Sequence, residues 1–328
     1  PAVLYNGMVA PLVGYGIKGA IWYQGESNQR RAFQYQELLP TMINDWRKRW
    51  ESEFPFYIVQ LASYGNKKPV STNAGEADTW AELQEAQYLT SITLPKCGLA
   101  VANDIGEEKD IHPKNKQEVG RRLALWALAK DYGKVSTIPS GPLYRNSTIQ
   151  GDKVRIQFDY TGTGLKTRDG GELKHFQITG ADKKWVWAKA KIEGNEVVVW
   201  HDDVKQPVGV RYAWAAWPQG ANLINAEGLP ASCFRTDEFL PSTLGVTSPF
   251  KEATAVGNSA FRSTTPAVAD TANGLDDVLR LALDLFAQLG DVLIERAAFR
   301  HVVEAPADIE QHITAHRLAH SIMQQFQN

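Results

Sequence analysis

Hydrophobic residues between positions 17 and 139 follow two alternating patterns. Short, nearly continuous apolar runs are typical of strands buried on both faces, and apolar residues at steps of three and four are typical of helices that lie on a sheet. The expected strands cover residues 17–23, 54–62 and 98–102, and the expected helices cover 35–50, 80–90 and 116–132. This alternation predicts βαβ units around a parallel sheet, so we assign residues 1–139 to an α/β domain.

The pattern changes after residue 139. Short alternating runs separated by Gly, Asn and Asp turns predict strands at 153–160, 173–179, 184–192, 196–200 and 208–214. Regular short strands with turn signals indicate antiparallel sheets, so we expect a small β-rich accessory unit over 140–243.

The two ends of the chain have other patterns. Apolar residues at near-helical spacing predict a helix over 1–15, and the abrupt start suggests a chain cut from something longer. Residues 244–272 have the Ser, Thr, Gly and Pro content of a linker, and 273–328 reads as an α-helical tail of unknown role. Histidines at 312, 316 and 320 recur every fourth residue, so a helix would align them as possible metal ligands, although no Glu or Cys completes the set.

Composition excludes several classes of partner. Apolar runs stay well below the ~18 residues that a membrane-spanning helix needs. A net charge of -2 provides no basic field for nucleic acid. Two distant cysteines indicate neither a metal site nor a redox compartment.

Two loops carry candidate chemistry. The first expected strand ends in Gln24-Gly25-Glu26-Ser27-Asn28, and the third leads into a loop that contains Asp110 and His112. Carboxyl ends of parallel strands share one edge of a sheet, where ligands bind. A histidine there is a candidate general base, and a nearby carboxylate can fix its tautomer.

These residues, together with Leu83-Gln84-Glu85-Ala86-Gln87, Asp104-Ile105-Gly106, Asp110-Ile111-His112-Pro113 and Gly228-Leu229-Pro230-Ala231-Ser232, resemble the sialate O-acetylesterases of the SGNH hydrolase superfamily. The resemblance covers about residues 1–240. It implies a three-layer hydrolase whose amino-terminal part is missing here, a secreted or periplasmic location, no cofactor or metal, and removal of O-acetyl groups from sugars, sialic acids first.

The resemblance also implies roles for individual residues. His112 falls on the catalytic histidine and Asp110 on its acidic partner, while Gln24 falls on a donor to the oxyanion. The wider superfamily has its acidic residue three positions before the histidine, where this chain has Lys109, so Asp104 is a reserve carboxylate. Glu26 and Asn28 would shape the substrate pocket.

The nucleophile is the point of departure from the family. Its serine lies in a Gly-Gln-Ser-Asn turn on the first strand, and this turn does not occur in the 328 residues. Gly257-Asn258-Ser259 lies in the expected linker, and Ser27 lacks the second glycine of a nucleophile elbow. We expect the serine upstream, in a missing segment of the same enzyme, and an inactive chain without it.

Two other functions fit the same residues. An acetylxylan esterase would use the same triad on a different sugar. A non-catalytic carbohydrate-binding fragment would use Trp214, Trp217 and Asn222, since tryptophan rings stack on sugar faces. If the protein is an O-acetylesterase, Trp214 and Asn222 are candidate substrate-binding residues.

Overall fold

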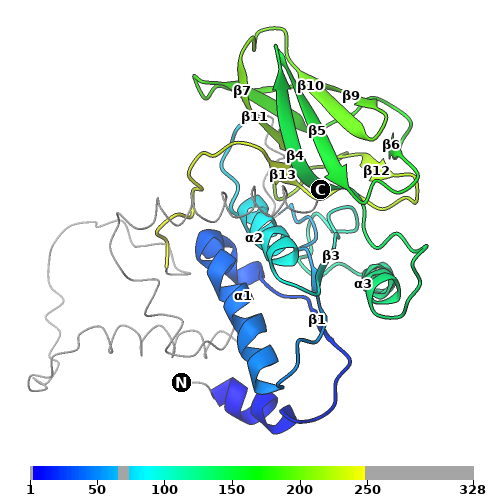
Figure 1. The fold of residues 1–328 in the computed structure, drawn as a ribbon. Helices are drawn as coiled ribbons and strands as arrows, with labels where there is room; N and C mark the ends of the chain where they lie inside the picture. Colours follow the sequence, from blue (N-terminus) through cyan, green and yellow to red (C-terminus); the bar gives the residue numbers. More distant parts are fainter. Residues whose placement is uncertain (1–2, 66–73, 248–328) are drawn as a thin grey trace, which may run out of the picture.

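The α/β part of the chain carries the expected parallel sheet. The computed structural model describes residues 3–65 and 74–247. Its elements before residue 139 are η1 (Tyr5–Val9), η2 (Ala10–Leu12), β1 (Ala20–Trp22), η3 (Glu26–Arg31), α1 (Ala32–Arg49), β2 (Phe56–Val59), α2 (Thr79–Thr93), β3 (Cys97–Ala100) and α3 (Lys116–Lys130). The strands lie in the order β1-β2-β3 and pair in parallel. Helices α1 and α2 lie on one side of this sheet and α3 lies on the other (Figure 1). The predicted α/β fold class is confirmed.

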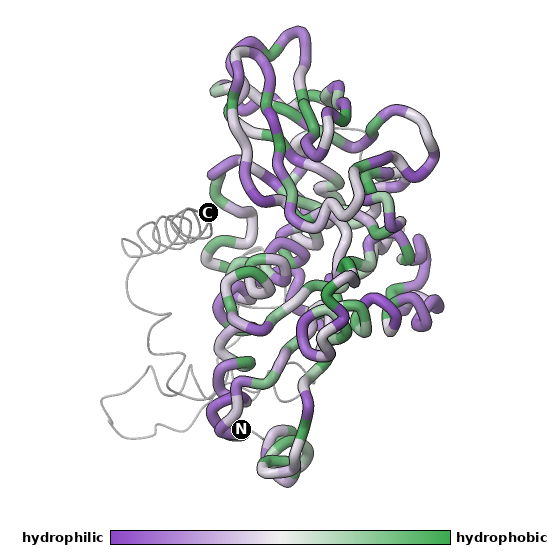
Figure 2. Tube along the Cα trace, turned by 45° about the vertical axis from the view of Figure 1, so that its right-hand side comes forward, coloured by the Kyte–Doolittle hydropathy of each residue, from purple (hydrophilic) through white to green (hydrophobic). Residues whose placement is uncertain are grey.

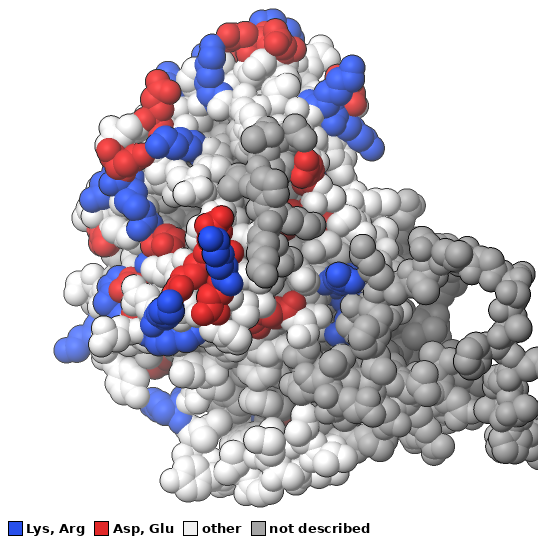
Figure 3. Space-filling model, turned by 180° about the vertical axis from the view of Figure 1, so that it is seen from behind, with Lys and Arg blue, Asp and Glu red and all other residues white. Residues whose placement is uncertain are grey.

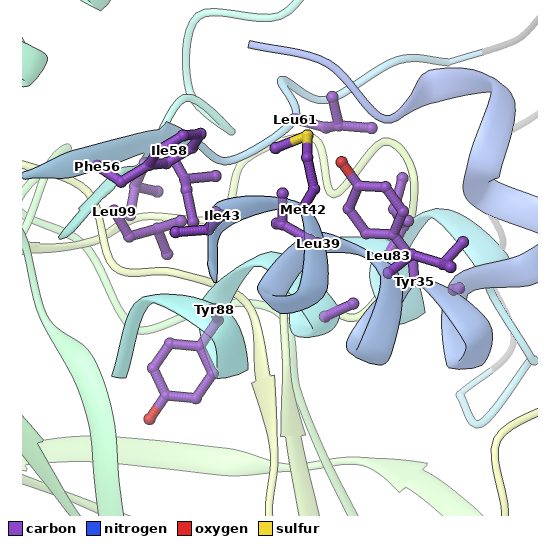
Figure 4. Close-up of a cluster of buried hydrophobic side chains, with 14 of the residues drawn as sticks. Tyr35, Leu39, Met42, Ile43, Phe56, Ile58, Leu61, Leu83, Tyr88 and Leu99 are labelled. Carbon is purple, nitrogen blue, oxygen red and sulfur yellow. The ribbon is translucent and has the colours of Figure 1, made fainter. Parts of the chain in front are cut away.

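The central strand β2 explains the layers. Its residues are all buried, and they alternate between two cores. Phe56 and Ile58 pack in the core formed with α1 and α2, where Figure 4 shows them beside Ile43 and Leu99. Tyr57 packs in the core formed with α3. A strand covered on both faces needs apolar residues at every position, which is why this segment lacks polar alternation.

The β-rich part consists mainly of two packed antiparallel sheets. Its strands are β4 (Leu143–Gln150), β5 (Lys153–Asp159), β6 (Leu165–Thr167), β7 (Phe176–Gly180), β8 (Trp185–Trp187), β9 (Lys189–Glu193), β10 (Glu196–Trp200), β11 (Pro207–Tyr212), β12 (Leu223–Asn225) and β13 (Phe234–Arg235). The sheets have the orders β4-β5-β10-β9 and β13-β11-β7-β8, and β12 pairs with β6. Hydrophobic and hydrophilic residues alternate along β5 and β9, and Figure 2 shows both kinds of residue interspersed in this part of the chain, because one face of each sheet packs in a shared core.

Two expected elements differ from the structure. Residues 184–192 were expected to form one strand, but they form β8 and β9 in different sheets, joined at Ala188 where the chain passes between the sheets. The helix expected over 1–15 is present over residues 3–12, but it is mainly the π-helical segment η1 followed by the 3-10 segment η2, and Pro11 lies in the second of them. Hydrophobic spacing reports burial, and it does not report which sheet a strand joins.

Several sequence-based expectations lie outside the described residues. They are the linker beyond residue 247, the helical tail over 273–328, the tail histidines and the serine at position 259. On the face seen in Figure 3, acidic and basic side chains of the described residues are intermixed. Among the described residues, none of the helices combines the length and apolar character needed to cross a bilayer.

Helix α2 joins the α/β part to the end of the β-rich part. The buried carboxylate of Glu82 accepts hydrogen bonds from the backbone N–H and the hydroxyl of both Ser242 and Thr243, at 2.6–3.1 Å. One turn further along, Glu85 pairs with the guanidinium of Arg235 at 2.8 Å. The carboxylates of Glu82 and Glu85 at this junction are therefore bound by protein groups instead of water.

Removing the Glu82 carboxylate should destabilise this junction. We expect Glu82→Ala to lower the free energy of unfolding by about 3 kcal/mol, because hydrogen bonds to charged groups contribute about 1.5–3 kcal/mol each and entering water offsets part of the loss. Urea denaturation measures the change. The control Glu37→Ala, at an exposed position of α1, should shift stability by less than about 0.5 kcal/mol. If Glu82→Ala lowered the free energy of unfolding as little as the control does, Glu82 would not stabilise the junction.

Candidate active site

The Gln24 turn lies at the carboxyl end of β1, and a glycine makes it possible. Gly25 has a φ of 141°, and a Cβ there would lie 3.2 Å from the Leu83 side chain and 3.3 Å from Nε2 of Gln87. Any other residue would combine backbone strain with a close contact. The turn therefore packs directly on α2.

Gln24 is held from two sides. The hydroxyl of the buried Tyr35 donates to Oε1 of Gln24 at 3.0 Å, and Nε2 of Gln87 donates to the Gln24 carbonyl at 3.1 Å. Trp22 in turn donates to the Tyr35 hydroxyl at 3.3 Å. Because the Tyr35 hydroxyl binds Oε1 of the Gln24 side-chain amide, the amide nitrogen of Gln24 is directed away from Tyr35. A fixed, neutral N–H donor is what an oxyanion-stabilising residue must supply.

The other residues of the turn are placed differently. Asn28 is fully buried, and its Oδ1 accepts from Arg31 at 2.6 Å, which stabilises the turn. Glu26 is partly buried. The burial of Tyr23, together with the nearby charge of Glu26, raises the pKa of Tyr23 to about 12. Ser27 is exposed.

His112 and Asp110 lie together on the loop between β3 and α3. The carboxylate of Asp110 accepts from the backbone N–H of His112 at 2.9 Å, and the same oxygen lies 3.5 Å from Nδ1 of the ring. The backbone hydrogen bond is the main reason that the pKa of Asp110 is lowered. The His112 side chain is 84% exposed. An ionised carboxylate on the Nδ1 side leaves Nε2 as the nitrogen that can exchange a proton with a reactant.

The reserve carboxylate is committed elsewhere. Asp104 is bound by Arg122 at 2.6 and 2.9 Å and by Arg168 at 2.9 Å. Both of its oxygens are thus bound by guanidinium groups, whereas Asp110 contacts His112 directly. Of the two carboxylates considered, the structure favours Asp110.

The two candidate loops leave the same edge of the sheet. Strands β1 and β3 flank β2 and run parallel to it, so the Gln24 turn and the His112 loop lie on either side of the end of β2. The side chain of Lys116, at the start of α3, reaches back over the ring of Tyr23, with 4.8 Å from Nζ to the ring centroid. The edge predicted from the sequence therefore brings both loops into one region.

Trp214 and Asn222 are not arranged for sugar binding. The Trp214 ring is buried, and the guanidinium groups of Arg211 and Arg235 lie 5.4 and 5.5 Å from it. The Asn222 side chain is also buried and is used inside the protein: its amide donates to Asp169 and to a backbone carbonyl, and its oxygen accepts from a backbone N–H. Neither side chain offers the open face that stacking or sugar hydrogen bonding needs, so these two expectations are corrected.

Sequence reasoning missed the residues that hold Gln24. Gln87 and Tyr35 contact it, yet they stand 63 and 11 positions away along the chain. A polar residue at a buried helical position was the available signal, since Gln87 lies on the buried face of α2. Within residues 3–65 and 74–247, histidine, cysteine and acidic side chains do not gather in groups of three that could hold a metal ion.

Comparison with known proteins gives this edge a family context. Residues 3–129, which include Gln24, Asp110 and His112, match the family model described as carbohydrate esterase, sialic acid-specific acetylesterase. Residues 3–129 belong to this family of carbohydrate esterases. The family resemblance read from the sequence is thus confirmed.

Individual relatives agree with this assignment. The sialate O-acetylesterases of Pongo abelii and Homo sapiens are each 30% identical to this chain over 236 residues, which are 66% of the chain and 44% of each relative. The crystal structure of a novel carbohydrate acetylesterase from Xanthomonas citri is 42% identical with a TM-score of 0.68, and covers 73% of this chain and 55% of that one. The chain therefore spans less than half the length of the two sialate O-acetylesterases.

Proposed function

We propose that this chain forms the histidine-bearing part of a carbohydrate O-acetylesterase that removes acetyl groups from sialic acids. The single observation that carries the proposal is the Asp110–His112 pair on the carboxyl edge of the sheet, inside the segment that matches the family. Sialic acid as the substrate rests on the names of the family and of the curated relatives.

In the proposed reaction, His112 is the general base and then the general acid. Its Nε2 takes the proton from a serine hydroxyl as the serine oxygen attacks the acetyl carbonyl carbon. The resulting imidazolium returns that proton to the departing sugar oxygen as the C–O bond breaks. Water then repeats the sequence on the acetyl-enzyme, releasing acetate. Asp110 would keep the ring oriented and stabilise its charged form.

The serine is proposed to lie outside these 328 residues. The Gly-Gln-Ser-Asn turn that the family uses is absent from the sequence. Ser27 is exposed and lies in the 3-10 segment between β1 and α1, but Gln29 stands where a nucleophile elbow has its second glycine.

Gln24 is proposed to donate to the oxyanion. In the complete enzyme, Gln24→Ala should lower kcat about 10²–10³-fold with little change in KM, because the negative charge it meets exists only in the transition state. Steady-state kinetics on an acetyl ester measure both constants. A rise in KM with an unchanged kcat would instead make Gln24 a substrate-binding residue.

Two assays test the proposal as a whole. Acetate release from O-acetylated sialic acid is compared with release from acetylated xylan, and glycan binding is measured on the same samples. The proposal predicts faster release from sialic acid. Faster release from xylan would retain the esterase and change the sugar, whereas binding without any release would overturn the enzymatic role.

A further inference from the structure

Asp104 lies where three parts of the molecule meet. It follows β3, and its carboxylate is bound through both oxygens by Arg122 of α3. Arg168, from the β-rich part, binds the same carboxylate at 2.9 Å. The side chains of Asp104 and Arg122 are only 9% and 6% exposed, so water competes little with the bonds between these two residues, whereas the Arg168 side chain is 43% exposed. We call these three residues the Asp104 clamp.

Arg168 is itself held firmly by its own unit. It follows β6, which pairs with β12, and its backbone N–H donates to the carbonyl of Asn222 at 2.8 Å. The Asn222 side chain then organises the turn that follows, through Asp169 and the backbone at positions 172 and 174. The buried asparagine therefore serves to present Arg168 and not to contact a sugar.

The Asp104 clamp holds the residues near the start of the His112 loop, Asn103 and Asp104, which we call the root of the loop. Next to it, Nδ2 of Asn103 donates to the carbonyl of Ala231, a second tie to the β-rich part at 2.9 Å. Further along, Glu107 closes the loop by accepting from the backbone N–H of Lys114 at 3.0 Å and pairing with its ammonium at 3.2 Å. His112 lies within this closed segment, so its position depends on where the root is held.

We propose that Arg168 is a positioning residue of the esterase: by holding Asp104 together with Arg122, it fixes the root of the loop that carries the catalytic histidine. This inference rests on the proposed function. The β-rich part would then be needed for catalysis without contacting the reacting atoms. A displacement of about 1 Å in a catalytic group can cost about 10²-fold in rate, so a modest loosening of this root would be measurable.

The first experiment measures the loop itself and uses the 328-residue chain. Hydrogen exchange of the backbone amides at positions 103–112 is compared between the parental chain, Arg168→Ala and Arg168→Lys. We expect exchange about 10-fold faster in Arg168→Ala, because local opening becomes easier, and an intermediate rate in Arg168→Lys. The control Arg155→Ala removes an arginine that pairs with Glu193 and Glu196 within the sheet β4-β5-β10-β9. It should leave the exchange of the amides at positions 103–112 unchanged. Parental exchange in Arg168→Ala would overturn the proposal.

The second experiment measures catalysis in the complete enzyme. Arg168→Ala should lower kcat about 10-fold and change KM less than about 2-fold, whereas Arg155→Ala should match the parent. In an Asp104→Asn background the Arg168→Ala effect should shrink, because the two residues act through one contact. A kcat equal to that of the Arg155→Ala control would overturn the positioning role.

The two experiments separate this inference from the proposed function. If the parental enzyme releases no acetate, or if it keeps its turnover without His112, the proposed function fails. The exchange comparison still decides whether Arg168 holds the loop, since it needs no activity.

Discussion

Replacing His112 with alanine in the complete enzyme is expected to lower the turnover of acetyl esters by about 10³–10⁶-fold, the range seen when a triad member is removed. Without the imidazole, no group takes the serine proton during attack or returns it to the leaving sugar oxygen. The fold should be unaffected, because the side chain is exposed and the backbone N–H that binds Asp110 is retained.

A second histidine provides the control for this substitution. His201 lies in a turn of the β-rich part, where its Nδ1 accepts from the backbone N–H of Asp203 at 3.1 Å. His201→Ala should keep parental kcat, and both variants should keep a parental far-UV spectrum. Near-parental turnover by His112→Ala would remove His112 from the mechanism.

The 328-residue chain on its own is expected to hydrolyse acetyl esters at close to the rate of a buffer blank. A base and an oxyanion donor have nothing to activate without a nucleophile, so the loss should approach the whole of the enzymatic rate enhancement. Adding the amino-terminal segment that carries the Gly-Gln-Ser-Asn turn, in the same chain or as a second chain, should restore hydrolysis. Initial rates with a chromogenic acetyl ester measure both states.

Ser27 makes this expectation open to a clear refutation. Robust hydrolysis by the chain alone, abolished by Ser27→Ala, would identify Ser27 as the nucleophile. Robust hydrolysis that survives Ser27→Ala would mean that another residue of these 328 attacks the ester. Either result would contradict the proposal that the serine lies elsewhere.

Local pattern predicted the elements that the sheet edge is built from. The apolar run around Phe56 and Ile58 predicted a strand covered on both faces, and the turn after β1 was located by Gly25 and its polar neighbours. The Asp110–His112 contact was predictable because the two residues are separated by one position, so a single loop brings them together.

Contacts between residues far apart in the sequence could not be predicted from local pattern. Asp104 looked like a free carboxylate near a histidine, but Arg122 and Arg168 stand 18 and 64 positions away and occupy it in the fold. Trp214 shows the same limit, because a tryptophan in a strand pattern fits a sugar-binding face and a core equally well. Only the burial of its ring in the fold, beside Arg211 and Arg235, distinguishes the two.

One complementation measurement tests the central claim, that His112 of this chain activates a serine supplied by another segment. Acetate release from O-acetylated sialic acid is followed for the amino-terminal segment mixed with the parental chain, with His201→Ala or with His112→Ala. The account predicts hydrolysis with the first two chains and the rate of a buffer blank with His112→Ala. Equal hydrolysis with His112→Ala and the parental chain would contradict it.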